Sequence, residues 1–325
     1  INVIMKTASH IKGLEVSGEV ASFDTDKERI SFGHKFGSGL EMLISGTRFR
    51  SKGQDLYYKE YNQPETNYGR SDNNDLETYS SFFANIKYAG FNVQGAYGSR
   101  GKTFPTGAYG TIFNDDRTEA VDTQGYIDVR YQKKFENTDD LTLRLFYDYY
   151  RYDGKFMFDY PPVTRNKDLA VGKWWGAEGH YTARIAGRHT VIGGFEYRDN
   201  FVQQQKNFDE SPYALYLDDN RSSYSIGVYA QGEFVLTDKL LINAGLRYDS
   251  YKDFQGNFSP RLALIYTPFE KTTIKLLYGE AYRIPNMYEL YYSDGNLTQK
   301  ANPALDPETV RTYQVVLEKY IKDYR

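Results

Sequence analysis

Cysteine is absent from the 325 residues, and the chain has only four histidines and two tryptophans. Without cysteine there is no disulfide scaffold, no thiolate metal site and no cysteine nucleophile. No apolar run approaches the roughly 18 residues that a membrane helix requires. The formal net charge is −3, so the chain lacks the excess of basic residues that nucleic-acid binding usually requires. The composition therefore excludes insertion as membrane helices and gives no reason to expect a nucleic-acid partner.

Tyrosine is abundant instead, since 32 Tyr and 20 Phe make the chain 17% aromatic. Tyrosine suits half-buried strands and membrane interfaces, where one end of the side chain is apolar and the other is wet. Residues 239–251, KLLINAGLRYDSY, place Leu240 and Leu246 on one face and Arg247 and Asp249 on the other. Such strict alternation predicts a half-buried β-strand.

Fourteen segments of this kind follow one another along the chain. They are residues 13–23, 28–36, 40–50, 80–89, 91–100, 124–135, 141–152, 173–186, 189–200, 223–236, 239–251, 258–268, 272–284 and 309–321.

The connections between these segments alternate in length. Every second connection is tight, and most of the others are long, near residues 51–79, 101–123, 153–172, 201–222 and 285–308. Short turns on one edge and long loops on the other are typical of a bacterial outer-membrane barrel, with an apolar band outside and a polar interior. A soluble sandwich or propeller explains neither the strand lengths nor this asymmetry. We therefore expect an all-β fold, a transmembrane antiparallel β-barrel.

Two sequence blocks near the end of the chain resemble a known family. The first is YGEAYRIPNMYELYY, and the second is NPALDPETVRTYQVVLE. Together they are similar to the conserved region of TonB-dependent outer-membrane receptors, in which a strand, a long loop and the next strand follow in this order. The residues that carry the resemblance are Glu280, Arg283, Pro285, Asn286, Glu289, Asn302, Pro303, Pro307 and Glu308.

The resemblance implies a 22-stranded barrel filled by an N-terminal plug, located in the outer membrane of a Gram-negative cell. On this basis about 14 of 22 strands are present. Residues 1–9 resemble the C-terminal end of a plug domain, and residues 10–325 correspond to a partial barrel. The implied function is import of a scarce nutrient, a ferric siderophore first and cobalamin next. The implied partners are the TonB–ExbB–ExbD system, acting through the plug, and outer-membrane lipid. A passive porin, an adhesin or another structural barrel is the alternative.

Aromatic residues in the expected loops are candidates for contact with a small-molecule chelate. Aromatic rings cover the apolar parts of a ligand, and a tyrosine hydroxyl serves its polar atoms. An interfacial girdle is the competing interpretation. The candidates are Tyr57, Tyr58, Trp174, Trp175, Tyr288, Tyr291 and Tyr292, with Tyr61, Phe156 and Phe158 in the same loops.

No sequence motif points to an enzyme, because Walker, G-x-S-x-G and HExxH motifs are all absent. We expect no catalytic residue, no metal site and no resident cofactor, although the substrate itself can carry iron or cobalt. Acidic pairs in the expected outer loops, Asp72 with Asp75, Asp115 with Asp116 and Asp218 with Asp219, raise calcium as a weak possibility beside ordinary solvated loops. The resemblance implies that a haem importer of this family would carry a haem-binding histidine between the two motif blocks. Residues 286–301 contain none, which disfavours haem as the substrate.

Arg283 is the charged residue of the first block that alternation places on the inward face, together with Lys275. Pro285 should end the strand, because proline cannot donate to the ladder. We expect Arg283 either to pair with a carboxylate of the plug or of a neighbouring strand, or to be solvated in the lumen. In the first case it would fix the base of the loop that follows.

Overall fold

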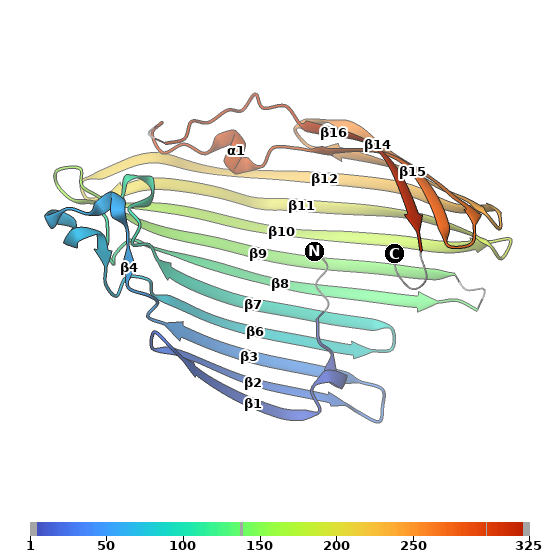
Figure 1. The fold of residues 1–325 in the computed structure, drawn as a ribbon, viewed down its shortest axis with the longest axis horizontal. Helices are drawn as coiled ribbons and strands as arrows, with labels where there is room; N and C mark the ends of the chain where they lie inside the picture. Colours follow the sequence, from blue (N-terminus) through green and yellow to red (C-terminus); the bar gives the residue numbers. More distant parts are fainter. Residues whose placement is uncertain (1–4, 137–138, 297, 321–325) are drawn as a thin grey trace.

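Fourteen antiparallel strands form a single sheet in the computed structural model, which describes residues 5–136, 139–296 and 298–320 (Figure 1). Along the sheet the strands keep their order in the chain, with β1 and β16 at its edges. The prediction of fourteen antiparallel strands is confirmed. The strands are β1 (Gly13–Ala21), β2 (Thr25–Lys35), β3 (Glu41–Ser51), β6 (Glu77–Tyr88), β7 (Phe91–Thr103), β8 (Glu119–Lys134), β9 (Asp140–Phe158), β10 (Thr164–Ile185), β11 (His189–Glu210), β12 (Tyr213–Thr237), β13 (Leu240–Tyr251), β14 (Phe254–Phe269), β15 (Thr272–Arg283) and β16 (Glu308–Lys319).

The remaining elements are short. β4 (Leu56–Tyr57) pairs with β5 (Arg70–Ser71), and α1 (Met287–Tyr291) is the one α-helix among the described residues. Within the described ranges, no helix has the length and apolar character needed to cross a membrane. Residues 5–9 of the expected plug end form no strand, and the 3-10 turn η1 (Ala8–His10) begins there. Residues 1–4 of that prediction lie outside the described residues.

One face of the sheet exposes an apolar band. Val228, Leu246, Leu262 and Leu276 lie on four successive strands, and between 46% and 49% of each residue is exposed. Alternate side chains of a strand point to opposite faces, so the alternation read from the sequence becomes a continuous apolar surface. This is the outward band expected of a membrane barrel.

The opposite face carries charges that are paired across strands. Arg144 forms ion pairs with Asp128 on β8 and, at 2.8 Å, with Glu178 on β10. Arg247 pairs with Glu196 on β11 at 3.0 Å and with Asp249 at 2.6 Å. Because these arginines are paired with carboxylates, this polar face suits the interior of a barrel.

The middle strands are much longer than the sequence predicts. β9, β10, β11 and β12 run for 19, 22, 22 and 25 residues, whereas a membrane crossing takes only about 9–11. Figure 1 shows them extending well beyond their shorter neighbours, toward the end of the sheet that carries β4. Of the five long loops predicted, those at residues 52–76, 104–118 and 284–307 are confirmed.

The long loops predicted near residues 153–172 and 201–222 are wrong. Only residues 159–163 and 211–212 lie outside strands there. In the second stretch Gln203, Gln204 and Gln205 are all polar, so alternation disappears from the sequence. The backbone ladder nevertheless continues, with Gln203 opposite Gly172 and Gln205 opposite Ala170. Beyond the membrane both faces of a strand meet polar surroundings, which removes the signal that alternation gives.

Candidate functional site

The loop of residues 284–307 begins with a capped turn of helix. β15 ends at Arg283, two residues before Pro285. Asn286 is the N-cap of α1: its Oδ1 accepts the backbone N–H of Glu289 at 2.9 Å, and Glu289 Oε2 accepts the N–H of Asn286 at 2.8 Å. This reciprocal capping box satisfies two backbone donors at the start of the helix. The first family block therefore encodes the stop of a strand and the start of a helix.

Arg283 joins the two family blocks at the base of this loop. Its guanidinium donates to both carboxylate oxygens of Glu289, at 2.8 and 3.0 Å, and to Glu308 Oε1 at 2.7 Å. Glu308 is the first residue of β16 and lies opposite Arg283 in the ladder. The carboxylate of a neighbouring strand that was expected for Arg283 is therefore Glu308. The backbone N–H of Asn302 closes the loop further by donating to the carbonyl of Leu290 at 2.9 Å.

The remaining residues of the two motif blocks lie around this junction. Glu280 accepts hydrogen bonds from Tyr278 on its own strand and, at 3.0 Å, from Arg311 on β16. Pro303 is exposed and Pro307 is half-buried, immediately before β16 begins. The motif residues thus hold the strand-loop-strand unit together.

The end of α1 is fastened to the wall formed by β10 and β11. Tyr292 is buried, and its hydroxyl donates to Asp168 Oδ2 at 2.9 Å. The Tyr292 hydroxyl oxygen in turn accepts the Asn207 side-chain amide N–H at 3.2 Å. Burial, together with the nearby Asp168 carboxylate, raises the pKa of Tyr292, so the phenol remains a donor at physiological pH. On the other side, the Arg221 guanidinium of β12 lies 3.4 Å from the centre of the Tyr291 ring, a cation–π contact.

A cavity of about 680 Å³ lies between this loop and the strand extensions. Small-molecule sites typically measure about 300–1,000 Å³. Its walls come from β9, β10, β11 and β12, from the loop of residues 104–118, and from the loop of residues 284–307. Residues that shape it include Tyr109, Tyr150, Tyr152, Phe156, Phe158, Tyr160, Asn166, Asp168, Trp174, Arg198, Gln205, Asn207, Asp209, Tyr216, Tyr288, Tyr292 and Asp294.

Aromatic rings give the cavity its apolar surface. Tyr288 and Tyr292 stack with ring centres 4.5 Å apart, and Phe158 stacks on Tyr160 at 5.0 Å. The Trp174 ring lies under the Arg198 guanidinium at 4.7 Å. These rings are large, rigid surfaces for the apolar parts of a ligand.

Hydrogen-bonded amides and carboxylates form the polar part of the wall. Asn166 Nδ2 donates to Asn207 Oδ1 and to Asp209 Oδ1, both at 2.9 Å. Tyr216 donates to the other oxygen of Asp209 at 2.6 Å. Because Asn166, Asn207 and Asp209 are all buried, this network holds its groups in fixed positions.

The structure brings three of the seven predicted contact residues into the cavity: Trp174, Tyr288 and Tyr292. Phe156 and Phe158 line it as well, but from strand β9 and not from a loop. Trp175 points its ring toward Tyr197, at 5.2 Å, and is absent from the cavity lining, as is Tyr291.

Tyr57 and Tyr58 lie in the loop of residues 52–76, away from the cavity wall. Tyr57 is 60% exposed on β4. Tyr58 and Tyr61 pack around Phe113 of the neighbouring loop, with ring centres 5.7 and 4.2 Å apart. Tyr58 and Tyr61 therefore form contacts between the loop of residues 52–76 and the loop of residues 104–118.

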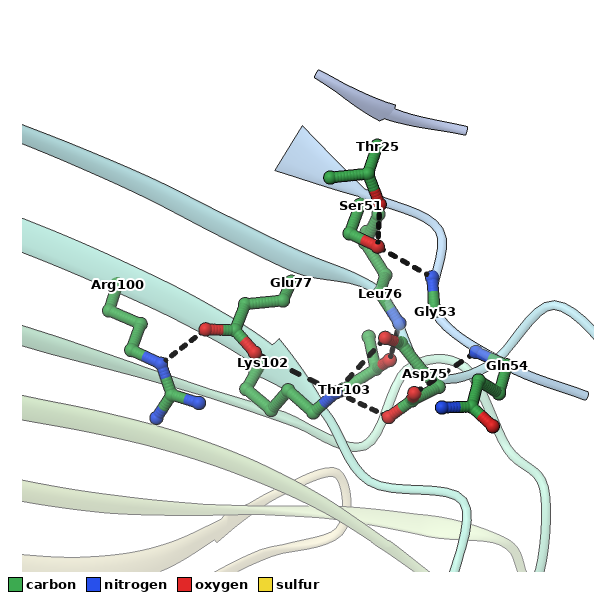
Figure 2. Close-up of polar contacts among 10 residues, drawn as sticks. All are labelled: Thr25, Ser51, Gly53, Gln54, Asp75, Leu76, Glu77, Arg100, Lys102 and Thr103. Atoms are coloured by element: carbon green, nitrogen blue, oxygen red, sulfur yellow. Dashed lines mark hydrogen bonds and ion pairs between the residues drawn. The ribbon is translucent and has the colours of Figure 1, made fainter. Parts of the chain in front are cut away.

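Polar contacts fasten the base of the loop of residues 52–76 to the ends of β6 and β7 (Figure 2). Asp75 forms an ion pair with Lys102 and accepts the backbone N–H of Gln54 at 3.1 Å. The N–H of Leu76 donates to Thr103 Oγ1 at 2.9 Å. This anchor involves neither the cavity nor the family motif.

Sequence reasoning missed the polar residues of the cavity: Asn166, Asp168, Arg198, Gln205, Asn207 and Asp209. They lie in strand extensions that the alternation pattern did not reveal. The dense polar run of residues 203–210, QQQKNFDE, is the signal that could have pointed to them, because such a run between two strands is unusual for an exposed turn.

The acidic pairs considered for calcium have basic partners. Asp115 pairs with Arg117, and Asp219 pairs with Arg221 at 2.7 Å. Asp218 and Asp219 lie on β12 and not in a loop, which corrects their predicted position. Within the described part of the chain, no group of three or more histidine or acidic residues is arranged to hold a metal ion.

Comparison with known proteins matches residues 57–324 to the family model described as TonB dependent receptor-like, beta-barrel. The chain belongs to this family. The resemblance seen in the two motif blocks is therefore confirmed, and this TonB-dependent receptor barrel is an outer-membrane protein of the Gram-negative type.

Relatives of this receptor barrel include the vitamin B12 transporter BtuB of Vibrio cholerae, which is 25% identical over 316 residues covering 91% of this chain and 46% of the transporter. Among solved structures, the ferripyoverdine receptor of Pseudomonas aeruginosa has a TM-score of 0.69 at 13% identity, covering 96% of this chain and 46% of that one. The FrpB iron transporter of Neisseria meningitidis has a TM-score of 0.66 at 16% identity. The match covers 98% of this chain and 55% of that one. The chain thus spans about half the length of these relatives.

Proposed function

We propose that this receptor barrel imports a scarce metal chelate, a ferric siderophore or a cobalamin, with energy delivered by the TonB–ExbB–ExbD system. The observation that carries the proposal is the cavity under the loop of residues 284–307, which combines a stacked aromatic surface with fixed polar groups. Rings can cover the apolar parts of a large chelate, while amides and carboxylates orient its polar edge. Binding and release need no bond-breaking chemistry, so we assign no catalytic residue and no resident cofactor.

The relatives support this class of substrate. One is named as a vitamin B12 transporter, and two solved neighbours are named as receptors for ferripyoverdine and ferric enterobactin. All of these are receptors or transporters for metal-containing molecules. We propose that residues 1–9 are the end of a plug domain through which TonB acts, and that outer-membrane lipid covers the apolar band.

Uptake by cells that carry the full-length receptor tests this function. A strain lacking other receptors for the chelate is supplied with radiolabelled ferric siderophores and cobalamin, with and without TonB. We expect saturable uptake that depends on TonB. Uptake that proceeds equally without TonB would support the passive porin and contradict the proposal.

Two adjacent tryptophans provide a matched pair of variants for the same assay. Trp174 lines the cavity, whereas Trp175 contacts Tyr197 outside it. Trp174→Ala should reduce uptake strongly, and Trp175→Ala should retain most of it at equal surface expression. Equal losses of uptake in the two variants would indicate that the substrate does not bind in this cavity.

A further inference from the structure

The charged groups of the cavity wall are predominantly acidic. Asp168, Asp209 and Asp294 line it together with a single guanidinium, Arg198, so the lining has a formal charge of −2. No lysine contributes to the lining from any described residue. Arg198 is itself engaged, since it lies over the Trp174 ring and its Nε donates to Asn200 Oδ1 at 2.8 Å.

A buried acceptor in the same wall lacks a donor. Gln205 is 6% exposed, and its Nε2 donates to the carbonyl of Met287 at 3.0 Å. Its Oε1 is buried and accepts no hydrogen bond from any residue that the structure describes. Buried polar atoms in native proteins are almost always paired. Because Gln205 lines the cavity, a turn of its amide toward the cavity would offer this oxygen to an N–H or O–H donor on a bound molecule.

We infer that the cavity selects an uncharged or cationic chelate that presents N–H or O–H donors, and that it discriminates against polyanionic chelates. This inference rests on the proposed function. The carboxylates attract positive or donor groups, and a trianion would meet like charge on a wall with one guanidinium already in contact with other groups. Like-charge juxtaposition is a common way to reject wrong partners.

Equilibrium binding to the purified full-length receptor tests the inference with three probes. These are an uncharged ferric trihydroxamate, the amide-rich cyanocobalamin, and a ferric tris-catecholate with three negative charges. At least one of the first two should bind about tenfold or more tightly than the tris-catecholate. Tightest binding of the tris-catecholate, or binding of none of the three, would overturn the inference.

Salt dependence provides a readout that needs no variant. Added salt screens repulsion between like charges, so residual binding of the tris-catecholate should strengthen with salt while that of the uncharged chelate stays nearly constant. Tris-catecholate binding that weakens with salt would indicate attraction and contradict the inference.

A single variant locates the effect in the cavity. Asp168→Asn removes one negative charge while its remaining oxygen can still accept the Tyr292 hydrogen bond, so it should improve tris-catecholate affinity several-fold. Asp72→Asn, in the loop of residues 52–76, is the matched control and should change nothing. If Asp168→Asn leaves tris-catecholate affinity unchanged, the inferred charge selection is wrong. TonB-driven uptake that prefers the tris-catecholate over both other chelates would keep the proposed function and remove only this inference, whereas loss of TonB dependence removes the proposed function.

Discussion

Two tyrosine-rich loops at the same end of the sheet have different anchors and different surroundings. The loop of residues 52–76 is fastened at its base by Asp75 and Lys102, and its rings pack on Phe113 of the adjacent loop. The loop of residues 284–307 is fastened through Tyr292 to the inner wall of β10 and β11, where it covers a cavity. Aromatic content is therefore a poor guide to which loop lines the cavity. The surface against which a loop is fastened decides what its rings can reach.

The largest expected difference between the two loops concerns Tyr292. Tyr292→Ala removes a ring of the cavity wall and the hydrogen bond to Asp168 together, so substrate affinity should fall by about 100-fold, the range of a buried aromatic hot spot. Tyr292→Phe keeps the ring and should lose less substrate affinity than Tyr292→Ala. Isothermal titration on the full-length receptor measures both.

Tyr58→Ala is the matched variant in the other loop. It disturbs packing on Phe113 but should leave substrate affinity within about threefold, because surface changes remote from a site seldom alter binding. A loss as large as that of Tyr292→Ala would erase the distinction between the loops.

A smaller effect is expected at the bases of the two loops. Arg283→Ala removes the pairs with Glu289 and Glu308, which should loosen the loop of residues 284–307 and weaken substrate binding several-fold at unchanged surface expression. Lys102→Ala loosens the other loop and should leave binding intact. Uptake and binding assays on cells compare the two variants. Unchanged binding and uptake by the Arg283→Ala receptor would show that the motif serves folding alone.

The smallest effect concerns pH. Arg283, with help from the backbone N–H of Asn286, holds the pKa of Glu289 below its usual value. A carboxylate with a lowered pKa stabilises the folded loop above its ordinary pKa, and this stabilisation is lost as the pH falls through the lowered value.

The protection of residues 284–307 against hydrogen exchange, measured as the exchange rate relative to the intrinsic rate at each pH, should accordingly be greatest at neutral pH and fall only in acid. Because Arg283 is exposed and Glu289 is only half-buried, the effect should be modest and should shrink with salt. Glu289→Gln should remove the pH dependence. Protection that falls instead as the solution becomes alkaline would contradict this account.

Much of the fold could be predicted from the sequence, because alternation survives wherever one face meets an apolar phase. Leu246 beside Arg247 is such a case. The same alternation, repeated along the chain, predicts the fourteen strands. Gln203 and Gln205 lie in strand extensions where both faces are polar, so the same method assigns them to a loop.

The candidate site could be predicted only in part. Tyr288 and Tyr292 lie next to recognisable motif residues, and their loop was identified correctly. Asp168 and Asn207, which hold Tyr292, are 124 and 85 residues away from it in the chain. Only the pairing of β10 with β11 brings these two residues together, and no local pattern encodes that contact. Tyr57 also lies in a tyrosine-rich loop, as Tyr288 and Tyr292 do, and yet it does not line the cavity.

Cysteine labelling tests most directly the central claim that substrate binds under the loop of residues 284–307. The present chain contains no cysteine, so single substitutions introduce unique thiols in it. Tyr288 and Tyr57 are similarly exposed, at 51% and 60%, which makes Tyr288→Cys and Tyr57→Cys a matched pair. Saturating substrate should slow maleimide labelling of Tyr288→Cys in the full-length receptor and leave Tyr57→Cys unaffected. Equal protection of both positions, or protection of Tyr57→Cys alone, would contradict the account.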